Sequence, residues 1–206
     1  MKSIYVESSR RVSLDREELK QLEKILPDAV YLAYSIQYKE LANQISKVIG
    51  KKIIGTSQIL GCSDLKTTAD AILLIGTGRF HAINIALSSG KEVFTFPNIS
   101  KIDRKEIETL ERREKGKYLK FLSSNHIGII ISVKNSQMNF GRALDLANNL
   151  EKSGKKPYLF VADNVNISDL DNFSLESWIN TACPDLANDS NVLNYKTLGK
   201  HQKIGV

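Results

Sequence analysis

"AVYLAYSIQYKELANQISKVIGKK" (residues 29–52) and "GIIISVKNSQMNFGRALDLANNLEKSGKK" (residues 128–156) share one order of features. Each begins with a continuous apolar run that reaches a serine, Ser35 or Ser132. A glutamine follows within five residues, then a stretch of helical period, and each segment ends in Gly-Lys-Lys. Apolar runs of strand length and apolar residues at helical spacing distinguish strands from helices. The chain is therefore predicted to contain one strand–turn–helix–strand unit twice.

The same alternation of strands and helices continues along the rest of the chain. Strands are predicted at 3–6, 28–35, 51–55, 70–76, 92–96, 126–133, 156–163 and 176–183, and helices after Asp15 and at 38–50, 80–90, 103–124 and 137–154. The fourth of these helices is expected to be interrupted or bent near Gly116. Continuous apolar strands alternating with helices imply a parallel sheet covered on both faces. We predict an α/β protein of two homologous three-layer units with mainly parallel sheets, related by pseudo-symmetry, over residues 1–100 and 101–206.

Composition and charge narrow the class of protein. The chain has 206 residues, of which 42% are hydrophobic, enough for a core in one large or two small domains. Its net charge of +6 comes from basic residues interleaved with acidic ones, which is typical of solvated helix faces. Aromatic residues do not punctuate the basic runs, so we expect no direct nucleic-acid binding. No apolar run is long enough to span a membrane and the N-terminus has no apolar signal region, so we expect a cytoplasmic protein.

The two cysteines of the chain both stand in a Cys-x-Asp-Leu tetrapeptide, at Cys62 and Cys183. Two distant cysteines make no disulfide framework, and thiolates are soft ligands that suit zinc or iron–sulfur clusters. Pairs of the form Cys-x-x-Cys are absent, and two thiols fall short of a four-ligand zinc site. Spacing alone thus favours core packing over metal binding. If the tetrapeptides mark equivalent positions of the repeat, both thiols face the crevice beyond the carboxyl ends of the strands.

A second candidate site is the glycine turn Gly76-Thr77-Gly78, which follows an apolar run and precedes a helix. Such a turn resembles a nucleotide-binding loop, in which helix N–H groups face an anion and glycines allow close approach. The dinucleotide fingerprint fails because His81 occupies the position of its third glycine. His81 can either donate a hydrogen bond to a ligand or cap and pack its own helix, and the residues alone leave both interpretations open.

Four segments carry a family resemblance. They are "SQILGCSDL", "ILLIGTGRFHAINIALSSGKEVFTFPN", "IGIIISVKNSQMNFGRALDLA" and "WINTACPDLAND". In this order, across nearly the whole chain, they resemble the second and third domains of the diphthamide synthase family, including its archaeal members. The resemblance implies three homologous α/β domains, each giving one cysteine to a 4Fe-4S cluster whose fourth iron stays open for S-adenosylmethionine. It also implies that the reduced cluster releases a 3-amino-3-carboxypropyl radical, which adds to a histidine of translation elongation factor 2 in the first step of diphthamide biosynthesis.

The resemblance also assigns residues and partners. The matching positions are Cys62 and Cys183 as cluster ligands, and Gly76, Gly78, His81 and Gln137 as residues at the S-adenosylmethionine pocket. Translation elongation factor 2 is implied as the protein substrate. An oligomer is implied because family members dimerise.

One departure from the family pattern is large. Met1 falls where the first domain of the family is finishing, so that domain and its cysteine are missing. We expect a subunit of the radical enzyme in which a homologous or first-domain subunit supplies the third cysteine. The alternatives are a non-catalytic accessory subunit and a degenerate α/β scaffold that binds a nucleotide at residues 76–78. A truncated form of a longer enzyme also fits the sequence.

Overall fold

A central parallel pair, β1 and β3, organises the first sheet. The structure is a computed structural model that describes residues 8–61, 63–134, 137–187 and 191–201. The chain divides into a first unit, residues 1–108, and a second unit, residues 109–206. The strand order in the first sheet is β2-β1-β3-β4-β5, and all pairs are parallel except β4 with β5. The strands are β1 (Ala29–Tyr34), β2 (Lys52–Gln58), β3 (Ala71–Ile75), β4 (Glu92–Phe96) and β5 (Ser100–Lys101).

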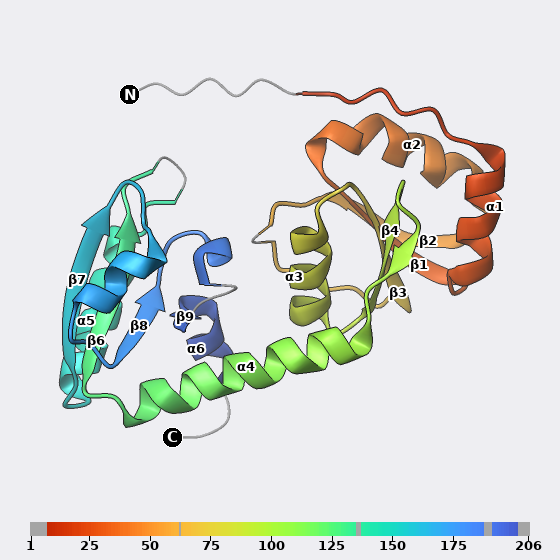
Figure 1. Ribbon diagram of the computed structural model, residues 1–206. Coiled ribbons are helices and arrows are strands. Elements are labelled where there is room, and N and C mark those ends of the chain that lie inside the picture. The colour runs from red at the N-terminus through yellow and green to blue at the C-terminus, as the bar shows by residue number, and fades with distance from the viewer. Residues whose placement is uncertain (1–7, 62, 135–136, 188–190, 202–206) are drawn as a thin grey trace. The chain divides into compact units, whose positions relative to one another are not determined.

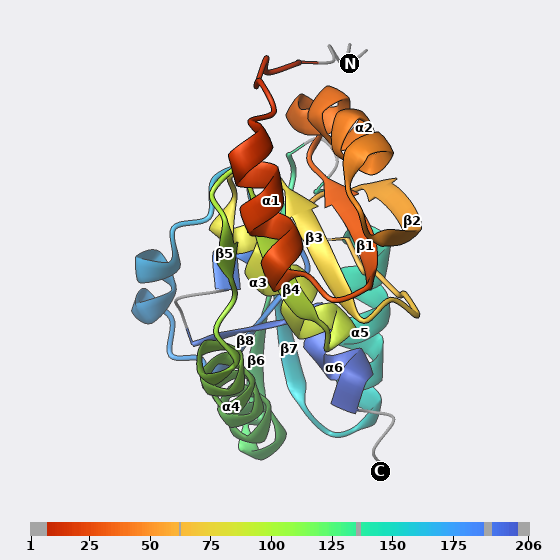
Figure 2. The same cartoon turned by 90° about the vertical axis from the view of Figure 1, so that its right-hand side faces the viewer.

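Helices cover both faces of this sheet, as Figures 1 and 2 show. They are α1 (Arg16–Ile25) and α2 (Lys39–Val48) on one face, and α3 (Arg79–Ser89) on the other. All five residues of β3 are buried, and their side chains alternate between the two faces. Leu73 packs in the core beneath α1 and α2, whereas Leu74 packs in the core beneath α3. The predicted three-layer unit is confirmed here, because a continuous apolar strand needs cover on both sides.

The second sheet is wholly parallel, with the strand order β7-β6-β8-β9. Its strands are β6 (His126–Ser132), β7 (Lys156–Ala162), β8 (Ser177–Asn180) and β9 (Val192–Asn194). One face packs against α4 (Arg104–Ser123), α5 (Phe140–Lys152) and α6 (Tyr195–His201). The other face carries the 3₁₀ helices η2 (Ile167–Asn172) and η3 (Pro184–Ala187). Short 3₁₀ helices and loops thus form the layer that α3 supplies in the first unit.

The two sheets repeat one strand order. The succession β1–α2–β2 corresponds to β6–α5–β7, the next strand is β3 or β8, and it lies on the other side of β1 or β6 in each sheet. The predicted repeat and the two mainly parallel sheets are therefore confirmed. The expected strand at 3–6 lies outside the described residues. The domain boundary expected after residue 100 stays a prediction, and the two units meet within α4.

Three details differ from the predictions. Helix α4 runs without interruption through Gly116, because one exposed glycine costs a helix only about 1 kcal/mol, and Lys117 pairs with Glu114 at 2.7 Å across it. The strand predicted to reach residue 183 ends at Asn180. Beyond it, the N–H of Ala182 bonds to the side-chain Oδ1 of Asn180 instead of to a neighbouring strand. Strands β5 and β9 were not predicted, since two or three residues give no readable period. Helix α6 was not predicted either, because its 7 residues make barely two turns.

Two glycines make a matched stability test. A Cβ on Gly128 would overlap the ring of Trp178, its cross-strand neighbour, whereas one on Gly116 would meet nothing within 4 Å. We expect Gly128→Ala to lower the free energy of unfolding by about 3 kcal/mol through overpacking. Gly116→Ala should raise it by about 0.5–1 kcal/mol through helix propensity. Urea denaturation measures both, and equal effects at the two positions would contradict the packing described.

Candidate functional site

A cavity of about 270 Å³ lies beyond the carboxyl ends of β1 and β3 in the first unit. It is lined by Ser35, Ile36, Gln37, Ile59, Leu60, Leu74, Gly76, Thr77, Gly78 and His81. The helix after β1 covers one face of the sheet and the helix after β3 covers the other, so the chain leaves these adjacent strands in opposite directions. Ligands of open α/β sheets bind in the crevice at such a switch point. The position of the cavity thus follows from the strand order.

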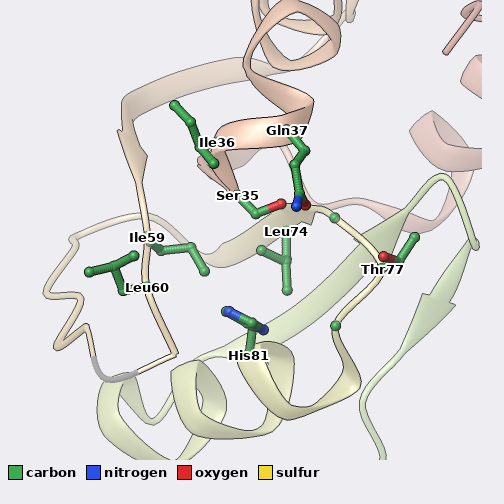
Figure 3. A pocket seen from close by; sticks show the side chains of 10 residues that line it. Ser35, Ile36, Gln37, Ile59, Leu60, Leu74, Thr77 and His81 are labelled. Carbon is green, nitrogen blue, oxygen red and sulfur yellow. The ribbon is translucent and has the colours of Figure 1, made fainter. Parts of the chain in front are cut away.

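Polar groups enter this cavity from two sides (Figure 3). The side chains of Ser35 and Gln37, just after β1, lie on one side, and the imidazole of His81, in the first turn of α3, lies on the other with Leu74 between them. The backbone N–H of Ser35 donates to the carbonyl of Ile75 at 3.2 Å, which ties the two strand ends together. The cavity therefore combines an apolar floor with hydroxyl, amide and imidazole groups, the usual composition of a small-molecule site.

Two of the predicted glycines make room for these polar side chains. A Cβ on Gly76 would lie 3.2 Å from Oγ of Ser35, and one on Gly78 would overlap Nδ1 of His81. The turn thus needs glycine because side chains approach its backbone closely. The two interpretations of His81 were a hydrogen bond to a ligand and packing on its own helix. In the structure its ring packs over Gly78 and also lines the cavity, so it is placed for both. Its backbone N–H bonds to the Gly78 carbonyl at 3.0 Å.

The segment that carries Cys62 forms another wall. Ile59 and Leu60 line the cavity, and Cys62 itself lies outside the described residues. On either side of it, Nδ2 of Asn84 donates to the carbonyl of Gly61 at 3.0 Å, and the N–H of Leu60 donates to Oγ of Ser63 at 2.8 Å. A Cβ on Gly61 would come within 2.5 Å of the Phe80 ring. Helix α3 therefore supports both the residues beside Cys62 and the wall that bears His81.

Cys183 follows β8 in the second unit, in a loop held by one buried side chain. Asn180 is 2% exposed, and its Nδ2 donates to the Cys183 carbonyl at 2.7 Å and to Oδ1 of Asn194 at 2.9 Å. Its Oδ1 accepts from the N–H of Ala182 at 2.9 Å. The Cys183 side chain is partly exposed and carries a free thiol. The loop is thus fixed through the backbone groups of Ala182 and Cys183, and the thiol takes no part in these hydrogen bonds.

Gln137 lies at the same end of the second sheet. Nδ2 of Asn139 donates both to the carbonyl of Gln137, at 3.3 Å, and to that of Thr181, at 3.2 Å. This asparagine joins the loop after β6 to the loop that leads to Cys183. The six predicted residues thus fall into two groups. The first unit holds the glycine turn, His81 and the segment of Cys62, and the second unit holds Gln137 and Cys183.

The two Cys-x-Asp-Leu tetrapeptides do not occupy equivalent positions, which corrects the sequence interpretation. In chain order Cys62 lies between β2 and β3, whereas Cys183 lies after β8, the counterpart of β3. The position equivalent to Cys183 in the first unit is the turn that begins at Gly76. Both segments still follow the carboxyl end of a parallel strand.

Two polar cavity residues outside the glycine turn were not identified from the sequence. Ser35 and Gln37 line the site, and the repeat already aligned them with Ser132 and Gln137, which was the signal available. Asn180 gave no such signal, because its role depends on a β8 shorter than predicted. Within the described residues no group of three or more His, Cys, Asp or Glu side chains could hold a metal ion. These residues alone therefore fit a cluster only in part.

Comparisons with known proteins show the family to which the chain is similar. Residues 1–197 match the family described as "Putative diphthamide synthesis protein". The 2-(3-amino-3-carboxypropyl)histidine synthase of Pyrococcus horikoshii is 29% identical over 136 residues, which cover 65% of this chain and 40% of that protein. Subunit 1 of the synthase of Dictyostelium discoideum is 30% identical over 166 residues, which cover 68% of this chain and 33% of that protein. The chain thus spans less than half the length of these curated relatives.

A solved structure shows the same fold. The crystal structure of Dph2 from Pyrococcus horikoshii with a 4Fe-4S cluster superimposes with a TM-score of 0.76 at 25% identity, covering 92% of this chain and 62% of that one.

Among the helices that the structure describes, none is long and apolar enough to cross a membrane.

Asn180 provides a test of the loop before Cys183. Replacing it with alanine removes both donors and leaves the Ala182 N–H without its acceptor, so we expect Asn180→Ala to lower the free energy of unfolding by about 2 kcal/mol. Amide hydrogen exchange over residues 181–187 should become faster. The exposed Asn164 is the control, and Asn164→Ala should stay within about 0.5 kcal/mol of the parent. Unchanged exchange in Asn180→Ala would contradict the role assigned to this side chain.

Proposed function

Because the chain belongs to the family of diphthamide synthesis proteins, we propose that it is a subunit of a radical S-adenosylmethionine enzyme. This enzyme transfers a 3-amino-3-carboxypropyl group to a histidine of translation elongation factor 2, the first step of diphthamide biosynthesis. The names of the relatives support the group and its acceptor, since each is a 2-(3-amino-3-carboxypropyl)histidine synthase. The observation that carries the proposal is the cavity of the first unit, which borders the segment of Cys62.

In this proposal the cavity binds S-adenosylmethionine. Leu74, Ile59 and Leu60 offer an apolar surface to the uncharged part of the ligand, while His81 and Ser35 supply hydrogen-bonding groups. The glycine turn at residues 76–78 lets the ligand approach the backbone. Gln137 stays a prediction from the family resemblance.

The proposed 4Fe-4S cluster needs more ligands than this chain has. The chain contains two cysteines, and the family resemblance implies three cluster thiolates. Cys62 and Cys183 would supply two of them, and we propose that a homologous or first-domain subunit supplies the third. When bound, the cluster and S-adenosylmethionine supply the radical chemistry. The residues of this chain hold the thiolates and orient the ligand.

Anaerobic iron–sulfur reconstitution tests the assembly. The purified chain is reconstituted alone and with a first-domain chain, and absorbance and EPR spectra report the cluster. We expect a cluster only with the partner and none after Cys62→Ser or Cys183→Ser, because each change removes one soft ligand. Urea denaturation should show that both variants are folded. A full cluster in either serine variant would contradict the proposed ligand set.

His81 is tested separately from the cysteines. In the reconstituted complex, His81→Ala should weaken S-adenosylmethionine binding about tenfold, the loss of one hydrogen bond, while the iron content stays unchanged. Isothermal titration calorimetry measures the affinity. The control is His126→Ala. His126 belongs to the second unit, where it stacks on Tyr158, and it is not one of the residues that line the cavity. Equal affinities of parent and His81→Ala would count against this cavity as the cofactor site.

The second candidate function is a non-catalytic accessory subunit. It is supported by the two cysteines of the chain, one fewer than the three cluster thiolates that the family resemblance implies. In that case Cys62→Ser and Cys183→Ser would leave the modification of elongation factor 2 intact beside a full-length relative. Nucleotide binding at residues 76–78 without iron would instead support the plain α/β scaffold.

A further inference from the structure

The side chain of Gln37 is a polar group of the cavity wall that the chain itself leaves available. Gln37 follows β1 and lies beside Ser35, across Leu74 from His81 (Figure 3). It is exposed, and within the described residues its side-chain amide has no hydrogen-bond partner. An amide carries two N–H donors and one carbonyl acceptor. A polar ligand in the cavity can therefore bond to it either as donor or as acceptor.

The backbone of Gln37 is held by a segment that does not line the cavity. This N-terminal segment, residues 8–14, has no regular secondary structure and runs past α2 into α1 (Figure 1). The N–H of Arg10 donates to the carbonyl of Gln37 at 2.9 Å. Val12 and Leu14 of the same segment pack against the core beneath α1 and α2. The N-terminal segment is thus attached both to the core and to the cavity wall.

The side chain of Arg10 makes a second attachment next to the first. Its Nη1 donates to the hydroxyl of Tyr38 at 3.1 Å. Tyr38 is 1% exposed and its ring belongs to the core of the first unit. The N–H of Tyr38 donates to the Ser35 carbonyl at 2.9 Å, which closes the β1–α2 turn, residues 35–38. One arginine thus holds two consecutive residues of the turn that brings Ser35 and Gln37 to the cavity.

The second unit holds the corresponding glutamine by other means. There the carbonyl of Gln137 accepts from Nδ2 of Asn139, a residue of the same loop, at 3.3 Å. In the first unit the bond to Gln37 comes from a segment that precedes the whole sheet in the chain. A change at Arg10 can therefore reach the cavity wall without altering a residue that lines the cavity.

We propose, resting on the proposed function, that the amide of Gln37 hydrogen-bonds to S-adenosylmethionine and that Arg10 is a positioning residue for Gln37. Arg10 holds the β1–α2 turn in the conformation that brings this amide to the ligand. A turn that is ordered in advance spares the ligand the entropy cost of ordering it. The affinity of the cavity thus depends on a residue outside the cavity.

Isothermal titration calorimetry of the reconstituted complex with S-adenosylmethionine tests both residues. Gln37→Ala should weaken binding about tenfold, the loss of one hydrogen bond. Arg10→Ala should weaken it about threefold, because the ligand must then order the turn itself. Tyr38→Phe should repeat the effect of Arg10→Ala, since it removes the hydroxyl and keeps the ring. The matched control is Arg11→Ala, at the exposed neighbouring arginine, which should leave the affinity unchanged.

A double variant separates positioning from a merely structural role. If Arg10 acts through Gln37, a chain with both Arg10→Ala and Gln37→Ala should bind as weakly as Gln37→Ala alone, about tenfold below the parent. Independent effects would instead multiply to about thirtyfold. Thermal denaturation checks that each variant is folded.

Amide hydrogen exchange without ligand reports on the β1–α2 turn directly. In Arg10→Ala the N–H of Tyr38, which bonds within the turn, should exchange several times faster than in the parent. The N–H of Ile59 donates to the Tyr34 carbonyl at 2.8 Å beside the same cavity, and its exchange should not change. A general loss of stability would accelerate both amides.

The possible failures can be told apart. Equal affinities of parent and Gln37→Ala would overturn the role of Gln37, even where His81→Ala binds weakly and the proposed function stands. Multiplied losses in the double variant, or unchanged exchange at Tyr38, would overturn the role of Arg10. A parent complex that does not bind S-adenosylmethionine would overturn the proposed function and this inference with it.

Discussion

The parallel pairing of β1 with β3 is the constraint on which the first unit depends. A parallel strand must be followed by a crossover before the next one, and the crossover must cover a face of the sheet. Here the crossovers after the two neighbouring strands cover opposite faces. The chain therefore leaves the ends of β1 and β3 in opposite directions, and the space between the two exits is the cavity lined by Ser35, Gln37 and His81. The site is thus a result of topology first and of side chains second.

The second unit repeats the strand order but uses it differently. Its second face is covered by 3₁₀ helices, and the loop after β8 is held by the buried Asn180 rather than by a glycine turn. The counterpart loop of the first unit begins at Gly76 and needs its small residues because Ser35 and His81 crowd it. Two copies of one fold have therefore specialised. One presents a cavity with polar walls, and the other presents a thiol on a loop with fixed backbone.

Much of this could be predicted from the sequence, for physical reasons. Strands such as β3 are continuous apolar runs, and the Asp15 cap accepts from two backbone N–H groups as expected, at 2.7 Å and 3.2 Å. The glycine turn was found because few other residues tolerate so close an approach. Ser35 and Gln37 have no local signature of a binding site, and only their alignment with Ser132 and Gln137 in the repeat pointed to them. The supposed equivalence of the two tetrapeptides failed because four residues do not determine topology, whereas strand order does.

Helix α3 has a consequence for energetics that follows from its two attachments. It supports the carbonyl of Gly61, beside Cys62, through Asn84, and it carries His81 at the cavity wall. A ligand in the cavity and an ion held beside Gly61 would share this one element as a support. If occupancy of one site restricts α3, it changes the affinity of the other, and thermodynamic reciprocity requires the same factor in both directions. The two affinities would then depend on each other through one shared helix.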